Sequence, residues 1–222
     1  LVALKDSHLS VSSDQGKAGT LTLMGGDIHV DGQSKLLATG SDGGGLIQVG
    51  GSWQNSDLSV RQAKTTRVDA GAVIDASATV RGDGGEIVVW SDISATDSIT
   101  DVAGRLLALG GRQGGDGGRI ETSGATLLLS PDLKVEASAA KGEAGLWLQD
   151  PFNYFINSAP AGTIAFSLNS GTNVTISTAV ENTSLGSSSN SGDPGNITLA
   201  SPISKTTGSP VTLTFEADND VV

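Results

Sequence analysis

The chain has 222 residues and a formal net charge of −11, with 31 glycines, no cysteine and only 4% aromatic residues. The acidic balance argues against binding to nucleic acid or to anionic lipid, since both repel a negative surface. The absence of cysteine excludes disulfides, thiolate nucleophiles and cysteine-ligated metals. Because 37% of the residues are hydrophobic, the chain is expected to fold around a thin aliphatic core.

A glycine-punctuated motif recurs five times in the first two thirds of the chain. Each copy has a short strand of small residues, a polar turn, a glycine and then an alternating strand. The first strands are residues 9–12, 37–40, 73–76, 107–110 and 135–138, and the second strands begin at Gly19, Gly45, Gly85, Gly118 and Gly145. The spacing between copies varies, which indicates a solenoid with loops of different length.

Strands this short bury one row of side chains each and depend on stacking against their equivalents for stability. The motif therefore predicts an all-β fold, a parallel β-helix in which inward residues such as Ile87 and Ile120 form rows. The motif glycines are expected at sharp turns, where a positive φ is needed. No persistent helical spacing is found, so no helix is expected.

One longer excursion, residues 52–69, interrupts the repeat. It carries Trp53, Arg61, Lys64 and Arg67 on an otherwise acidic chain. Irregular insertions on regular solenoids are common sites of function. These four residues are therefore the predicted contact for a glycan or partner. The alternative is a cover strand, with Trp53 packed inward and the basic residues paired with carboxylates.

The composition changes near residue 150, where Asn, Ser and Thr replace glycine. We expect residues 1–150 to form glycine-motif coils and residues 151–222 to form further coils of one continuous solenoid. Strands are expected at residues 164–168, 173–177, 197–200 and 211–215, with a loop at residues 181–194. Both ends read as uncapped strand, which predicts a segment of a longer rod and end-to-end self-association.

Other candidate chemistry is weak. His8 and His29 lack ligand neighbours and are expected at the surface. The glycine clusters at residues 82–85 and 114–118 are interpreted as structural turns, with weak calcium binding as the alternative. Asp92, Asp97 and Asp101 form the densest acidic run, and they are expected to be solvated rather than catalytic. No catalytic, cofactor or metal site is predicted. Trp90 and Trp147, both at strand positions, are expected to be packed.

Several runs resemble one family. They are residues 84–92, 114–124, the Leu148-Gln149-Asp150-Pro151-Phe152-Asn153 junction, 173–178 and 195–203. Together they resemble the large filamentous haemagglutinin-like exoproteins of Gram-negative two-partner secretion. The resemblance implies a right-handed parallel β-helix, secreted through an outer-membrane transporter partner and used at the cell surface as an adhesin or biofilm component. The family's N-terminal secretion motifs are not visible in the sequence, so the chain is expected to belong to the passenger region of such a protein.

The sequence thus predicts a non-enzymatic structural and adhesive segment of a secreted surface protein. Two alternatives stay open: an enzyme acting on polysaccharide along one face of the solenoid, and the stalk of a contact-dependent toxin. Asn173, Asn182 and Asn196 fit the glycosylation sequon, which some members of the family use. Within strands, however, asparagine and threonine ladders are the expected role.

Overall fold

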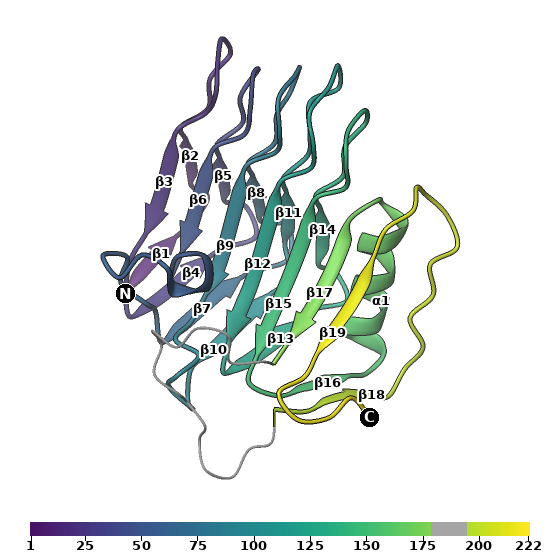
Figure 1. Ribbon diagram of the computed structural model, residues 1–222. Coiled ribbons are helices and arrows are strands. Elements are labelled where there is room, and N and C mark those ends of the chain that lie inside the picture. The colour runs from purple at the N-terminus through teal and green to yellow at the C-terminus, as the bar shows by residue number, and fades with distance from the viewer. Residues whose placement is uncertain (179–194) are drawn as a thin grey trace.

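The computed structural model describes residues 1–178 and 195–222. Three parallel sheets surround one core (Figure 1). Sheet A consists of β1 (Val2–Leu4), β4 (Asp27–Val30), β7 (Thr65–Val68), β10 (Ile99–Val102) and β13 (Thr126–Leu129). Sheet B consists of β2 (His8–Ser10), β5 (Lys35–Leu37), β8 (Val73–Asp75), β11 (Arg105–Leu107) and β14 (Lys134–Glu136). Sheet C consists of β3 (Thr20–Leu23), β6 (Leu46–Val49), β9 (Glu86–Trp90), β12 (Arg119–Gly124), β15 (Leu146–Pro151), β17 (Asn173–Ser177) and β19 (Leu213–Glu216).

The chain visits sheets A, B and C in that order five times, from β1 to β15, and we call each round a pass. Within each sheet, every strand pairs in parallel with its equivalents in the neighbouring passes, except that the end strands β1, β2, β3, β13 and β14 have such a partner on one side only. The predicted mostly-β fold built from parallel strands is confirmed. The predicted second strands of the motif lie in sheet C, and the predicted first strands lie at sheet B but are set one or two residues late in four of the five copies, so that residues 37–40 share only Leu37 with β5.

The motif did not predict most of the strands of sheet A. The excursion, predicted to run from residue 52 to 69, is shorter, because Thr65–Val68 forms β7 and pairs with both β4 and β10. Arg67 therefore belongs to the repeating scaffold. Asp101, predicted to lie on a polar loop, is likewise a residue of β10.

The core is built from inward rows in exact register across the passes of sheet C. Ile47 pairs with Ile87, Ile87 with Ile120, and Ile120 with Trp147. All four side chains are fully buried. Because each apolar residue meets a similar residue on both sides, a thin core is filled without large aromatic clusters.

The motif glycines serve a different purpose from the one predicted. None of the five has a positive φ; that conformation occurs at other glycines, such as Gly50 and Gly82. A β-carbon on Gly45 would lie 2.1 Å from the carbonyl oxygen of Gly19, and one on Gly118 would lie 2.1 Å from that of Gly85. Glycine is needed at Gly45, Gly85, Gly118 and Gly145 because the backbones of adjacent passes approach too closely for a side chain, whereas a β-carbon on Gly19, in the first pass, would make only ordinary contacts at 3.4 Å.

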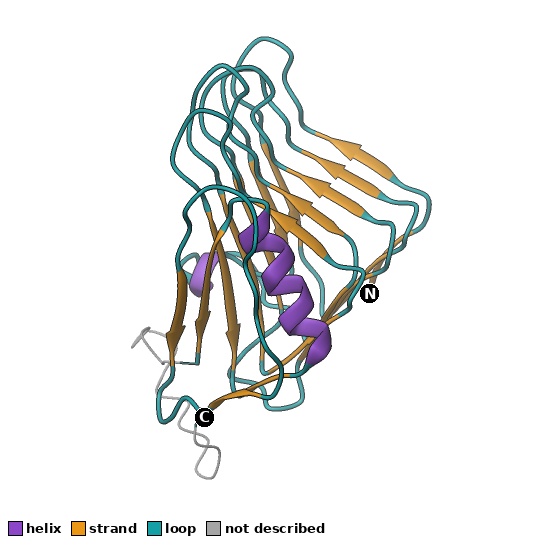
Figure 2. Cartoon of the chain, turned by 90° about the vertical axis from the view of Figure 1, so that its right-hand side faces the viewer, coloured by secondary structure: helices purple, strands orange, loops and turns teal. Residues whose placement is uncertain are grey.

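A helix, α1 (Ser158–Asn169), replaces the strand predicted at residues 164–168. Its N-cap is Asn157, whose side-chain oxygen accepts a hydrogen bond from the Ala159 N–H at 3.1 Å. Ile164 and Leu168, spaced as on one helix face, are buried at the end of sheet B, where α1 packs against β14 (Figure 2). No helix of the described residues is long and apolar enough to cross a membrane.

The remaining strands follow the prediction closely. Asn173–Ser177 is β17, and β18 (Ile197–Leu199) and β19 overlap the predicted ranges. β18 pairs with β16 (Tyr154–Ile156) rather than joining one of the three larger sheets. The predicted loop at residues 181–194, with Asn182, lies outside the described residues.

Candidate functional site

The excursion, residues 52–64, lies on the outer face of sheet C. It begins with a short 3-10 helix, η1 (Trp53–Asn55), in which Gln54 and Asn55 have positive φ values of 45° and 49°. The Gln62 side-chain oxygen accepts a hydrogen bond from Trp90 Nε1 at 2.9 Å. Trp90, which points outward from β9, is fully buried in this way, as predicted.

Trp53 contacts the scaffold through a cation–π interaction. The guanidinium carbon of Arg119, at the start of β12, lies 4.4 Å from the centre of the Trp53 ring. Arg119 also pairs with Glu86 of the preceding pass, with Nε donating to Oε2 at 2.7 Å. The Trp53 ring, partly exposed, is thus held beside a charged pair.

Glu121 lies beneath the excursion and is fully buried. Its Oε2 accepts a hydrogen bond from the Gln54 N–H at 2.9 Å, and its Oε1 accepts one from Ser123 Oγ at 3.0 Å. Burial raises the pKa of Glu121 to about 8, and the nearby carboxylates of Asp150 and Glu86 add to the increase. The carboxyl group is therefore protonated at neutral pH.

Of the predicted basic residues, Arg67 does not share a surface with Trp53. Arg67 lies on β7 of sheet A, where its Nε donates to Asp69 Oδ1 at 2.7 Å. Lys64 Nζ pairs with Asp97 Oδ2 at 2.5 Å. Arg61 is exposed. The pairing of Lys64 and Arg67 matches the cover-strand alternative, whereas the partly exposed Trp53 ring on sheet C keeps a role in contact open.

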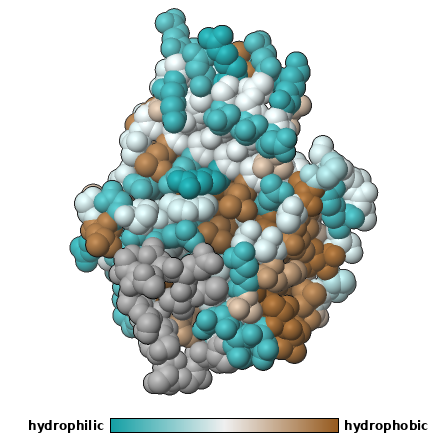
Figure 3. All heavy atoms as spheres, viewed as in Figure 1, coloured by the Kyte–Doolittle hydropathy of each residue, from teal (hydrophilic) through white to brown (hydrophobic). Residues whose placement is uncertain are grey.

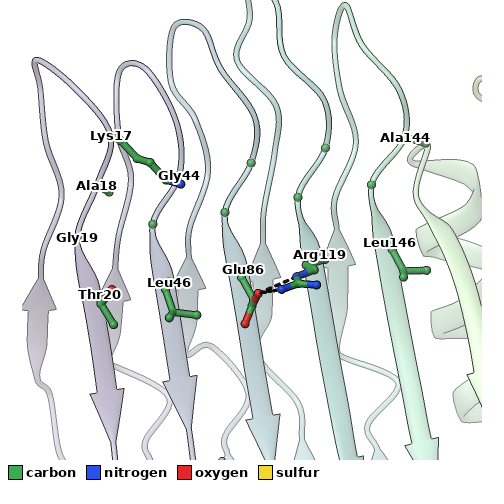
Figure 4. A pocket seen from close by; sticks show the side chains of 16 residues that line it. Lys17, Ala18, Gly19, Thr20, Gly44, Leu46, Glu86, Arg119, Ala144 and Leu146 are labelled. Carbon is green, nitrogen blue, oxygen red and sulfur yellow. Dashed lines mark hydrogen bonds and ion pairs between the residues drawn. The ribbon is translucent and has the colours of Figure 1, made fainter. Parts of the chain in front are cut away.

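A furrow of about 680 Å³ crosses the starts of β3, β6, β9, β12 and β15 (Figure 4). The five motif glycines line it. Because glycine has no side chain, this strip of the surface is lower than its surroundings. Polar side chains border it: Lys17, Glu86 and Arg119. Arg119 lines the furrow and also contacts the Trp53 ring of the excursion. The furrow and the excursion therefore meet at Arg119 and form one candidate binding surface.

The other candidate residues have structural roles. Asp83 Oδ1 accepts a hydrogen bond from the Asp116 N–H, and Asp116 Oδ1 accepts one from the Glu143 N–H, each at 2.8 Å. The glycine clusters are thus turns joined from pass to pass. Within residues 1–178 and 195–222, no group of three or more histidines or carboxylates is placed to hold a metal ion.

The predicted positions of the remaining residues are confirmed. His8 is exposed, and His29 Nε2 lies 2.8 Å from Asp69 Oδ2 with its side chain 40% exposed. Trp147 is fully buried. Asn173 joins two passes, with Nδ2 donating to the Ala144 carbonyl oxygen and Oδ1 accepting from the Thr212 N–H.

Sequence reasoning missed Glu86, Arg119 and Glu121. Period-two alternation places all three on the outward face of their strands. This alternation was the sequence signal that could have identified them as surface residues. Their meeting with Trp53 is a long-range contact, with Arg119 and Trp53 far apart in sequence, and no local pattern reports it.

No protein-family model matches the chain, and no curated protein matches it either. The resemblance to filamentous haemagglutinin-like exoproteins therefore stays a prediction.

Proposed function

We propose that this chain is a segment of a right-handed parallel β-helix, in a secreted bacterial surface protein of the filamentous haemagglutinin-like kind, with a structural and adhesive role. The observation that carries the proposal is the fixed rotation of the chain through sheets A, B and C, with residue-for-residue register between passes. Such a scaffold extends by repetition and presents its surface over a long distance, as a connecting or projecting element requires.

The adhesive part of the proposal rests on the furrow and Trp53. An open furrow bordered by a lysine and an Arg119–Glu86 pair offers hydrogen-bond donors and acceptors to hydroxyl groups. The partly exposed Trp53 ring beside it offers an apolar face to a sugar ring. A linear glycan lying across the strands would meet both features.

Secretion through an outer-membrane transporter partner and a place at the cell surface complete the proposal. They are supported by the resemblance and by a cysteine-free, acidic composition. End-to-end association is a further prediction of this proposal.

The test is binding of the labelled chain to an array of bacterial and host glycans. We expect Trp53→Ala to weaken binding by about tenfold or more, the usual effect of truncating a central aromatic contact. Phe155→Ala, at an exposed aromatic outside the furrow lining, is the matched control. Equal binding by wild type and Trp53→Ala would count against the site. Release of oligosaccharides from a bound glycan would favour the enzyme alternative instead.

A further inference from the structure

Sheet A is interrupted at its C-terminal end. Its last strand, β13, pairs with β10 on one side, and the next strand of the chain on this side of the molecule, β16, pairs with β18. A cleft of about 500 Å³ separates β13 from β16, and the first turn of α1 contributes Ala159 and Pro160 to its lining. The cleft lies beside the edge of β13 that pairs with no strand among the described residues.

Both walls of the cleft present backbone groups suited to a strand. Thr126 N–H at the start of β13 and Ser130 N–H just after its end donate to the carbonyl oxygens of Ser98 and Val102, so the backbone of every second residue from Thr126 to Ser130 faces β10. In a parallel ladder the residues between them face the other edge, which places the N–H and C=O of Leu127 and Leu129 toward the cleft.

The opposite wall follows the same rule. Tyr154 N–H donates to the Asn196 carbonyl oxygen at 2.9 Å, on the β18 side of β16. The backbone of Phe155 therefore faces away from β18, and its N–H is directed toward the cleft, while its carbonyl oxygen accepts a hydrogen bond from the Asn157 N–H at 3.2 Å. Two strand edges thus border a single gap.

The side chains of the cleft select an apolar occupant. Leu128 is 49% exposed and Phe155 is 58% exposed, one on each wall. None of the lining residues is Asp, Glu, Lys, Arg or His, although the chain as a whole carries a net charge of −11. Hydrophilic surface gathers at the top of Figure 3, over the loops that lead into β3, β6, β9, β12 and β15 in Figure 1.

We propose that the cleft between β13 and β16 binds an extended, uncharged and apolar peptide segment of another polypeptide by strand addition. The segment extends sheet A by hydrogen bonding to the backbone groups of Leu127 and Leu129 on β13 and to the N–H of Phe155 on β16. Its outward side chain packs between Leu128 and Phe155. A charged segment is rejected, because it would bury a charge among side chains that cannot pair with it.

The probe is a fluorescent, acetylated Thr-Val-Val-Val-Thr peptide, and its control carries an N-methyl group on the central valine. N-methylation keeps the side chains and removes one backbone donor, so we expect it to weaken binding by about tenfold, whereas binding through side chains alone would leave it unchanged. Hydrogen exchange provides the second measurement. Bound peptide should slow exchange of the Leu127 and Leu129 amides, which face the cleft.

The matched variants are Leu128→Asp in the cleft and Leu58→Asp on the excursion, where Leu58 is 76% exposed. We expect Leu128→Asp to weaken peptide binding by about tenfold or more and Leu58→Asp to leave it unchanged. Absence of binding at about 1 mM peptide, or equal binding of the N-methylated control, overturns the proposal. A dimer that Leu128→Asp dissociates would also overturn it, since the occupant would then be a second copy of this chain.

Discussion

The inner and outer faces of sheet C are built from the same strands but are stabilised differently. On the inner face, Ile47, Ile87 and Ile120 stack on one another in register and are fully buried. On the outer face, Glu86 and Arg119 form a partly exposed ion pair, and Glu121 is buried beneath the excursion.

The difference shows that the two faces of a sheet in a solenoid are buried for different reasons. An inner residue meets similar neighbours in the passes before and after it, so its burial follows from the repeat itself. An outer residue is buried only where a non-repeating segment covers it. Changes to the inner face should therefore destabilise the whole fold, whereas changes to the outer face should act locally and depend on the excursion.

The largest expected effect is that of Ile120→Asp. The substitution places an unpaired carboxylate in a row shared with Ile87 and Trp147. We expect a loss of about 4 kcal/mol or more of unfolding free energy, measured by urea denaturation, or failure to fold. Leu46→Asp, on the outer face of the same sheet, is the control, and a similar loss there would contradict the distinction between the two faces.

The second effect is a dependence of stability on pH caused by Glu121. Burial raises its pKa from 4.5 to about 8, so the folded chain keeps a proton that the unfolded chain releases in this range. The free energy of unfolding should therefore be highest near the lower value and fall by about 1.4 kcal/mol per pH unit until pH approaches 8.

The comparison of wild type with Glu121→Gln isolates this dependence. Glutamine keeps an acceptor for the Gln54 N–H and carries no titrating proton, while the neighbouring Glu86, Asp150 and Arg119 stay in place. Denaturation curves between about pH 5 and pH 8 should slope downward for wild type and be flatter for the variant. Parallel slopes would show that Glu121 is ionised in the folded chain.

The same contrast explains how much of the fold was predictable. The strands of sheet C from β3 to β15 each follow a motif glycine directly and alternate regularly, and the five motif copies place the strands of sheets B and C at or within a few residues of their positions. β7 and β10 carry no glycine and have charged residues, Arg67 and Asp101, within them, so they read as loops. The helix was missed because a short run such as residues 164–168 fits a buried strand as well as a helix face.

The candidate site was predictable only in part. Trp53 was identified because it lies outside the repeat. Arg119 and Glu121, which lie beside the excursion, belong to a strand of the repeat, and nothing in that strand marks them as different. Their burial depends on where the excursion folds back, which is a tertiary contact. Arg67 does not lie beside Trp53 for the same reason, since it belongs to β7 of sheet A.

The third effect concerns the motif glycines. In Gly45→Ala the new methyl group would lie 2.1 Å from the Gly19 carbonyl oxygen, so adjacent passes must separate. We expect a loss of about 1–3 kcal/mol, measured as a lower Tm. Gly162→Ala is the control, because nothing lies within 4 Å of its β-carbon position in α1, and it should stabilise the chain by up to about 1 kcal/mol. A loss at Gly45 no larger than at an exposed loop glycine would refute the close-approach argument.

The smallest effect should come from the contact between Trp53 and Arg119. A double-mutant cycle with Trp53→Ala, Arg119→Ala and the pair isolates it from the Arg119–Glu86 ion pair, which is present in wild type and in Trp53→Ala. We expect a coupling free energy of about 0.5–1 kcal/mol, because Arg119 is half exposed and its charge is screened by water.

If the excursion is only a cover, both single variants should lower Tm. If Trp53 is held for a ligand, Trp53→Ala should leave Tm nearly unchanged while weakening glycan binding. The contact would then be retained at the surface for recognition, with stability supplied by the inner face of sheet C.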